Sequence, residues 1–141
     1  MKTETLIVLL QIAAICHLGL VWAGATMPKA VNLTGHLATL PPFLRRLFLV
    51  YLTFIGLVLL GFGTLTFFFA RSIAVGDPLA RGLCTLFVAF WTLRLIVAAF
   101  VFDVRPYLKN WLYRGGYWAT NLVFVYLLAV YVLALWKGGQ L

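Results

Sequence analysis

Three polar side chains could carry chemistry inside a largely apolar sequence: His17, Arg94 and Tyr126. Each lies near the middle of a stretch of about twenty apolar residues, and at 1.5 Å per residue all three fall at a similar depth. An arginine in the middle of an apolar helix costs roughly 3 kcal/mol on insertion scales, so it usually has a structural or functional reason to be there. We therefore take these three residues as the candidates for ligand binding.

The positive charge of Arg94 has no acidic residue at its own depth. Of the three acidic residues, Asp103 follows it on the same helix but is about half a turn out of phase. Three ways of compensating the charge stay open. The guanidinium can reach lipid phosphate; it can donate to Tyr126, Gln11, a neutral His17 or carbonyl groups; or it can meet an anionic ligand or a partner subunit's acid.

His17 suggests a redox role, because haem in helical bundles takes axial histidines and quinone sites use them too. The only other histidine, His36, lies in a predicted loop, so a haem with two histidine ligands is disfavoured. A packed, hydrogen-bonded histidine is the favoured interpretation. Cys16 and Cys84 lack metal-ligand spacing and are predicted to pack in apolar surroundings.

The sequence contains no paired carboxylates, phosphate-binding loop or Ser/His/Asp set at plausible depth. We therefore predict no catalytic residue, no bound metal ion and no cofactor. It also contains no motif specific enough to indicate a family.

These side chains must be positioned by helices that cross a membrane. The chain has 141 residues, of which 65% are hydrophobic and 10% charged, whereas soluble domains are about half apolar and a quarter charged. Four segments reach the length of about twenty residues that a helix needs to span a bilayer. They cover about 6–25, 47–70, 83–102 and 117–136. The predicted fold is all-α: an integral membrane protein with four transmembrane helices in one compact bundle with short loops.

Prolines mark the predicted helix starts. Pro41-Pro42 suits the first turn of the second helix, while Asp77 and Pro78 suit the cap and first position of the third. That third helix is expected to continue to Pro106.

The longest predicted loop is 26–44, and Gly115-Gly116 is predicted to break the chain before the last helix. Residues 1–25 also fit a cleaved signal peptide, which would leave three helices, but a retained first span is favoured because Gln11 and His17 interrupt the apolar run.

Helical spacing predicts which faces pack. In the second helix, one stripe gathers small and hydroxylated residues, as close helix contacts in lipid do: Thr53, Gly56, Leu60, Gly63, Thr64 and Phe67. The predicted packing face of the last helix contains Tyr117, Asn121, Phe124, Leu128, Tyr131 and Leu135. Polar contacts between helices are predicted for Asn121, Asp103 and Gln11.

Apart from Arg94, the basic residues behind the net charge of +8 lie at segment ends and in loops, which is the pattern of contacts with lipid phosphate rather than with nucleic acid. Their distribution favours a multi-pass protein of a bacterial inner membrane, with the first and third loops in the cytoplasm and both termini periplasmic.

The favoured function is non-enzymatic: a membrane subunit, assembly factor or scaffold, with the bilayer, other membrane subunits or a second copy as partners. One alternative is a small transporter or channel that binds an anion at Arg94. A less favoured one is a membrane redox protein that binds quinone or haem at His17.

Overall fold

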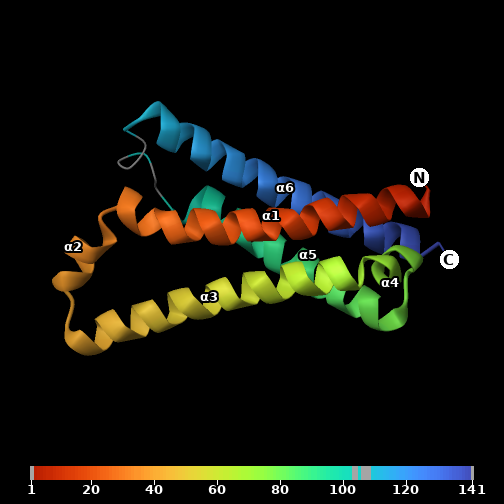
Figure 1. Cartoon of the computed structure of the whole chain (residues 1–141), viewed down its shortest axis with the longest axis horizontal. Coiled ribbons are helices and arrows are strands. Elements are labelled where there is room, and N and C mark those ends of the chain that lie inside the picture. Colours follow the sequence, from red (N-terminus) through yellow and green to blue (C-terminus); the bar gives the residue numbers. More distant parts are fainter. Residues whose placement is uncertain (1, 103–104, 106–108, 141) are drawn as a thin grey trace.

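The computed structural model describes residues 2–102, 105 and 109–140, and its elements are all helices (Figure 1). The four long ones are α1 (Thr3–Ala30), α3 (Pro42–Phe68), α5 (Pro78–Phe100) and α6 (Trp111–Gly138). Two short helices, α2 (Leu33–Ala38) and α4 (Ala70–Val75), connect them. The long helices contain 28, 27, 23 and 28 residues and are each long and apolar enough to cross a membrane. The all-helical prediction is confirmed.

The predicted helix starts are confirmed, but the predicted end of the third helix differs. Pro42 and Pro78 occupy the first turns of their helices, and Asp77 is the N-cap residue of α5. The end of α5 comes at Phe100, ahead of Pro106, which lies outside the described residues. There the N–H groups of Val101 and Phe102 both donate to the carbonyl oxygen of Val97, which closes the final turn.

Two predicted breaks are helical in the structure. The segment 26–44, predicted as a loop, contains the end of α1 and all of α2. Gly115 and Gly116, predicted to interrupt the chain, lie inside α6. A glycine costs a helix only about 1 kcal/mol relative to alanine, and that cost is small beside the need of every backbone group in an apolar medium for a hydrogen bond.

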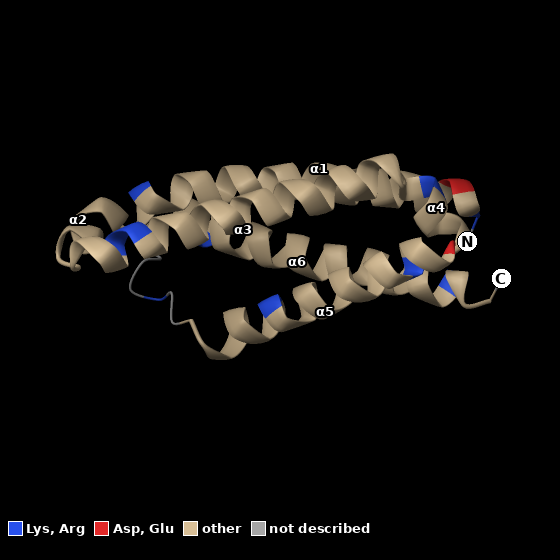
Figure 2. Cartoon of the chain, turned by 90° about the horizontal axis from the view of Figure 1, so that it is seen from below, with Lys and Arg blue, Asp and Glu red and all other residues tan. Residues whose placement is uncertain are grey.

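The long helices diverge from one end of the bundle to the other. Both chain ends and α4 lie together at one end, here called the terminal end, and α2 lies at the opposite, loop end (Figure 1). The helix α1 packs against α3 and α6, and α5 packs against α6. Toward the loop end, α6 separates from α1 in Figure 1 and α5 separates from α1 and α3 in Figure 2.

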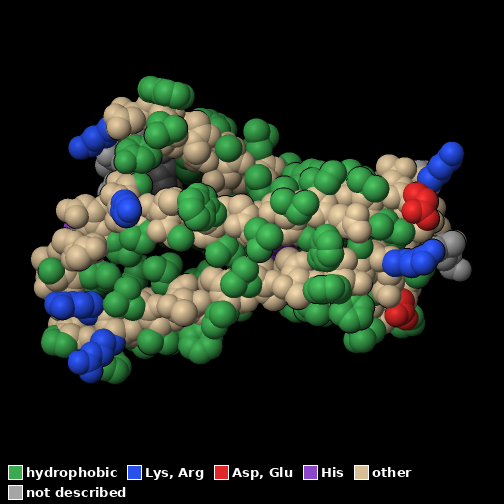
Figure 3. Space-filling view, viewed as in Figure 1, with side chains coloured by type: hydrophobic (Ala, Val, Ile, Leu, Met, Phe, Trp, Pro, Cys, Tyr) green, Lys and Arg blue, Asp and Glu red, His purple; other side chains and the backbone are tan. Residues whose placement is uncertain are grey.

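Burial follows this divergence. In the half nearer the terminal end, here called the closed half, every long helix has buried residues. In chain order they end at Leu20 in α1 and at Trp91 in α5, and they begin at Gly63 in α3 and at Phe124 in α6. The remaining parts of the long helices, here the open half, contain no buried residue: 21–30, 42–62, 92–100 and 111–123. The bundle is therefore compact in one half only, and apolar side chains cover much of its surface (Figure 3).

The closed half is fastened at the terminal end. Three residues of α4 are buried there: Ala70, Ile73 and Ala74. Gly76 then turns the chain with a φ of 78° and lies directly against Gly138 at the end of α6. At the loop end, Arg45 donates from Nε to the carbonyl oxygen of Leu37 at 3.0 Å, so α2 is held to the start of α3.

The packing face predicted for α3 is confirmed at Gly63 but wrong at most of its other residues, and that predicted for α6 agrees with the structure. Thr53, Leu60, Thr64 and Phe67 are exposed, while α3 turns Gly63 and Thr66 inward. In an apolar helix, any face is compatible with lipid. Small residues therefore indicate where another helix could pack, but they do not determine which face does. On α6, Phe124 and Tyr131 are buried as predicted.

Candidate functional site: a polar layer in the closed half

Each of the four long helices contributes one polar side chain to the core of the closed half. They are His17 from α1, Thr66 from α3, Trp91 from α5 and Tyr131 from α6, and the exposed fraction of each is 0–1%. His17 lies at the centre, with ring centroids of Trp91 and Tyr131 at 5.4 and 6.3 Å. We call these four residues the polar layer.

Hydrogen bonding defines the state of His17. Its Nδ1 lies 2.8 Å from the carbonyl oxygen of Ala13, one turn earlier in α1. Because a carbonyl oxygen only accepts, Nδ1 is the protonated nitrogen, and in the neutral ring Nε2 carries a lone pair. Nε2 is buried and has no hydrogen-bond partner among the described residues, so it is an acceptor that stays unused.

The indole N–H of Trp91 is the matching donor. Nε1 is buried and also has no partner within the described part of the chain, and the indole ring meets the imidazole at 67°. An unpaired buried polar group costs about 1–3 kcal/mol. The polar layer therefore contains one buried acceptor and one buried donor that have no hydrogen-bond partner among the described residues.

Thr66 and Tyr131 satisfy each other across the bundle. Thr66 Oγ1 and the Tyr131 hydroxyl are 2.6 Å apart, joining α3 to α6. The close approach of α1 to α3 depends on Gly63, because a Cβ there would lie 2.9 Å from Cβ of His17. A glycine thus makes the room in which the polar layer forms.

We predict that Tyr131→Phe lowers the free energy of unfolding by about 1 kcal/mol, the typical net value of one buried hydrogen bond. Thr66→Val should cost a similar amount, and the double variant should cost less than the sum, because both single variants break the same bond. Unfolding midpoints in mixed micelles measure these values. Thr64→Val is the control, since the Thr64 hydroxyl donates to its own helix at Leu60. If the losses of unfolding free energy in the two single variants add fully in the double variant, the hydrogen bond between Thr66 and Tyr131 is contradicted.

The structure separates the three residues predicted to share one layer. His17 belongs to the polar layer, but Tyr126 donates from its hydroxyl to the carbonyl oxygen of Leu9 at 2.9 Å, which joins α6 to α1. Arg94 makes no hydrogen bond or ion pair to either, or to any other described residue. Sequence counting also missed Thr66, Trp91 and Tyr131 as the other members of the layer that contains His17.

The three residues predicted to make polar contacts between helices behave differently. Asn121 donates from Nδ2 to the carbonyl oxygen of Tyr117 at 2.9 Å, within its own helix. Gln11 is half-buried and has no hydrogen bond to a described residue. Asp103 lies outside the described residues.

Arg94 lies at the boundary between the closed and open halves. Its guanidinium carbon is 5.3 Å from the ring centroid of Phe124 and 5.8 Å from that of Phe102. Counted along α5, Arg94 is about 24 Å from Pro78 and about 9 Å from Phe100, so it lies closer to the loop end than the predicted span 83–102 implied.

The sequence does contain a signal for Trp91. The buried residues of α5 recur every three or four positions, at Ala80, Cys84, Phe87 and Trp91, which is the spacing of a packed helical stripe. Thr66 and Tyr131 carry no comparable signal, because hydroxyl groups are common on exposed faces as well.

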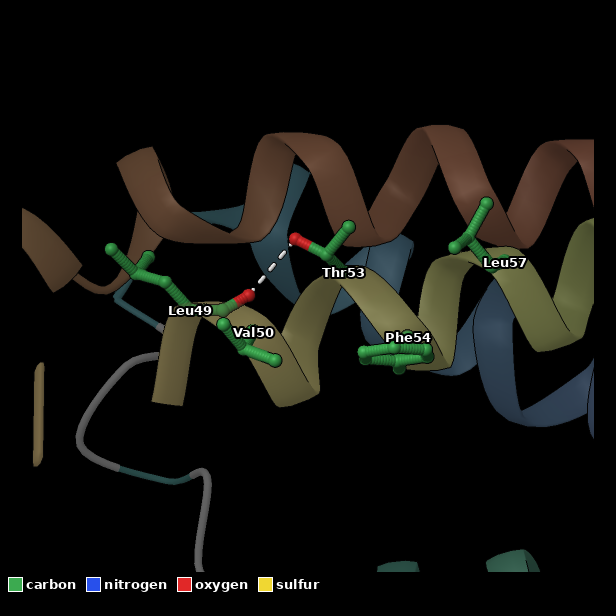
Figure 4. A pocket seen from close by; sticks show the side chains of 5 residues that line it. All are labelled: Leu49, Val50, Thr53, Phe54 and Leu57. Carbon is green, nitrogen blue, oxygen red and sulfur yellow. Dashed lines mark hydrogen bonds between the residues drawn. The ribbon is translucent and has the colours of Figure 1, made fainter. Parts of the chain in front are cut away.

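A shallow hollow on α3 offers only apolar contacts (Figure 4). Five residues of this one helix line a volume of about 310 Å³: Leu49, Val50, Thr53, Phe54 and Leu57. The Thr53 hydroxyl donates to the carbonyl oxygen of Leu49 at 2.9 Å and is therefore satisfied within the helix. The hollow fits an acyl chain better than a polar ligand.

Comparisons of the chain with protein-family models, curated proteins and solved structures found no match. The polar layer and Arg94 are therefore interpreted from their own geometry.

Proposed function

We propose that the protein crosses the membrane four times and acts without catalysis, as a small subunit, assembly factor or scaffold of another membrane protein. The main support for this proposal is the packing of the open half. There, no side chain of the four apolar helices is fully buried, although helices in lipid associate through close side-chain packing. A helix of another membrane protein would supply the packing that the chain does not make itself.

The open half contains glycines that another helix could approach, as the closed half does at Gly19 and Gly82. A Cβ built on Gly24 of α1, Gly56 of α3 or Gly116 of α6 would meet no atom within 4 Å. Small residues at helix surfaces let a second backbone approach closely in lipid. These positions are therefore open to a helix from outside the chain.

Charge supports a membrane location and one orientation. The basic residues beside the loop end, Lys29, Arg45, Arg46, Lys109 and Arg114, outnumber those at the terminal end, Lys2, Arg71, Arg81 and Lys137. Figure 2 shows Asp and Glu at the terminal end of the described chain as well. Cytoplasmic loops carry the excess of Lys and Arg. We therefore propose a cell membrane, of bacterial inner-membrane type, with the loop end in the cytoplasm and the termini in the periplasm.

The two alternative functions gain less support. An anion transporter needs polar groups along a path, whereas the buried polar side chains of the described residues gather in one layer. A redox role for His17 would use Nε2, which is buried, and the imidazole ring is packed beside Phe62 and Trp91.

Site-specific photo-cross-linking in native membranes tests the proposal. Ala98 continues the packed stripe of α5 into the open half, and Leu86 is an exposed residue of the closed half. We expect a benzophenone amino acid at position 98 to form one discrete adduct, and the same group at position 86 to form none. Mapping the adduct to a transmembrane helix of a different protein would support a partner. Adducts to lipid alone, or equal adducts at both positions, would contradict it.

A further inference from the structure

The start of α3 combines an exposed cation and an apolar hollow on one helix face. Arg46 precedes Val50, Thr53 and Leu57 by four, seven and eleven positions, and residues at this spacing share a face. All three line the hollow of about 310 Å³ that Figure 4 shows. Arg46 therefore lies in line with the hollow, at the end of it that is nearer the loop end.

The hollow offers a ligand apolar contact. Its five lining residues are all exposed, and the hydroxyl of Thr53, which is its one polar side chain, donates to the carbonyl oxygen of Leu49. Helices in lipid approach closely where small residues lie, whereas this hollow is lined mainly by branched and aromatic side chains. Its lining therefore favours a flexible acyl chain over a second transmembrane helix.

The depth of the hollow matches one leaflet of a bilayer. Leu49 and Leu57 lie about 5 and 17 Å beyond Arg46 along α3, and one leaflet supplies half of a hydrocarbon core of about 30 Å. Side chains of a helix lean toward its N-terminus, which for α3 is the loop end. With the hollow among the acyl chains, the guanidinium of Arg46 thus lies at the level of the headgroups.

The charge of the loop end favours an anionic headgroup. Figure 3 shows Lys and Arg side chains at this end, and the described basic residues beside it are Lys29, Arg45, Arg46, Lys109 and Arg114. Of the three acids of the chain, Glu4 and Asp77 lie at the terminal end. Asp103, outside the described residues, can neutralise only one of these basic side chains. The loop end therefore keeps an excess of positive charge, which attracts anionic lipids.

Arg46, rather than its neighbour Arg45, is placed to hold the headgroup. Arg45 donates to the carbonyl oxygens of Leu37 at 3.0 Å and Ala38 at 3.2 Å, and it lies about 100° around the helix from Arg46. Arg46 is exposed, and the parallel N–H groups of a guanidinium match two oxygens of a phosphate.

We infer that an anionic phospholipid binds along α3, with its phosphate on Arg46 and an acyl chain in the hollow. The site rests on the membrane location proposed above and needs no protein partner. In the proposed orientation it lies in the cytoplasmic leaflet, which is the leaflet that carries anionic lipids.

Photo-labelling of the purified full chain in nanodiscs tests this site. Either phosphatidylglycerol or phosphatidylcholine carries a diazirine on its acyl chain, and the adducts are mapped by mass spectrometry. We expect phosphatidylglycerol to label the segment 49–57 about five-fold more than phosphatidylcholine, the effect of one basic contact with an anionic lipid. Arg46→Gln should lower labelling by phosphatidylglycerol to the level of phosphatidylcholine, and Arg46→Lys should retain most of it because it keeps the charge.

Two matched controls separate the site from general attraction. Arg114→Gln removes an exposed charge of the loop end from α6 and should leave the labelling of 49–57 nearly unchanged. Val50→Trp should fill the hollow and lower this labelling several-fold. Ile55→Trp, at an exposed position on the opposite face of α3, should not.

Equal labelling of 49–57 by the two lipids would overturn the site, as would equal losses from Arg46→Gln and Arg114→Gln. Displacement of phosphatidylglycerol by inorganic phosphate alone would show that the hollow contributes nothing, and would overturn it too. The absence of lipid adducts from all four long helices would instead contradict the membrane location itself. Unfolding midpoints of the variants in mixed micelles, expected to match that of the unaltered protein, verify that they fold.

Discussion

Replacing Gly76 with alanine is expected to lower the free energy of unfolding by about 2–5 kcal/mol. Two separate costs add at this position. The φ of 78° lies in the left-handed region, which costs residues with a Cβ about 1–2 kcal/mol. In addition, the new Cβ would lie 2.7 Å from Cα of Gly138, and backbone atoms at a helix end cannot move aside as a flexible side chain can.

Gly82→Ala is the matched control for this prediction, because no atom lies within 4 Å of its Cβ position and α5 gains a better helix former. It should leave stability unchanged or raise it by up to about 1 kcal/mol. Gly76→Asn should fall between them, since asparagine tolerates the left-handed conformation but still meets Gly138. Equal unfolding midpoints for Gly76→Ala and Gly82→Ala in mixed micelles would show that the terminal end is not closed by this contact.

The second large effect is expected from Gly63→Leu, which should destabilise the protein by about 3 kcal/mol, the upper end of the usual cost of overpacking. Even the Cβ atom would lie 2.9 Å from Cβ of His17 and 3.3 Å from the carbonyl oxygen of Ala14. Because both belong to α1, the helices themselves must separate. That separation would also disturb the bond between Thr66 and Tyr131, one turn away.

Gly61→Leu tests whether this cost belongs to the contact or to the helix. Gly61 lies two positions earlier in α3, and nothing lies within 4 Å of its Cβ position. Leucine there is expected to have little effect on the unfolding midpoint. A comparable loss from both changes would mean that α3 is sensitive to any large residue, and that Gly63 has no special role beside His17.

Much of the helical layout follows from local chemistry. Runs of apolar residues long enough to cross a bilayer specify four helices. Prolines and an aspartate specify where α3 and α5 begin, because a proline lacks the N–H that a first turn does not need. Local signals were weaker at Gly115-Gly116 and in 26–44, where the demand for backbone hydrogen bonds overrides a modest preference against helix.

The site depended on contacts that no local pattern specifies. His17, Thr66, Trp91 and Tyr131 lie far apart in the sequence, and they meet because Gly63 lets α1 and α3 approach closely. The position of Arg94 beside Phe124 and Phe102 likewise depends on where α5 begins and ends, and on the divergence of the helices beyond Trp91. In an apolar chain every helix face tolerates lipid, so hydropathy indicates that helices form but not which faces they share. Steric fit between particular residues on different helices decides that.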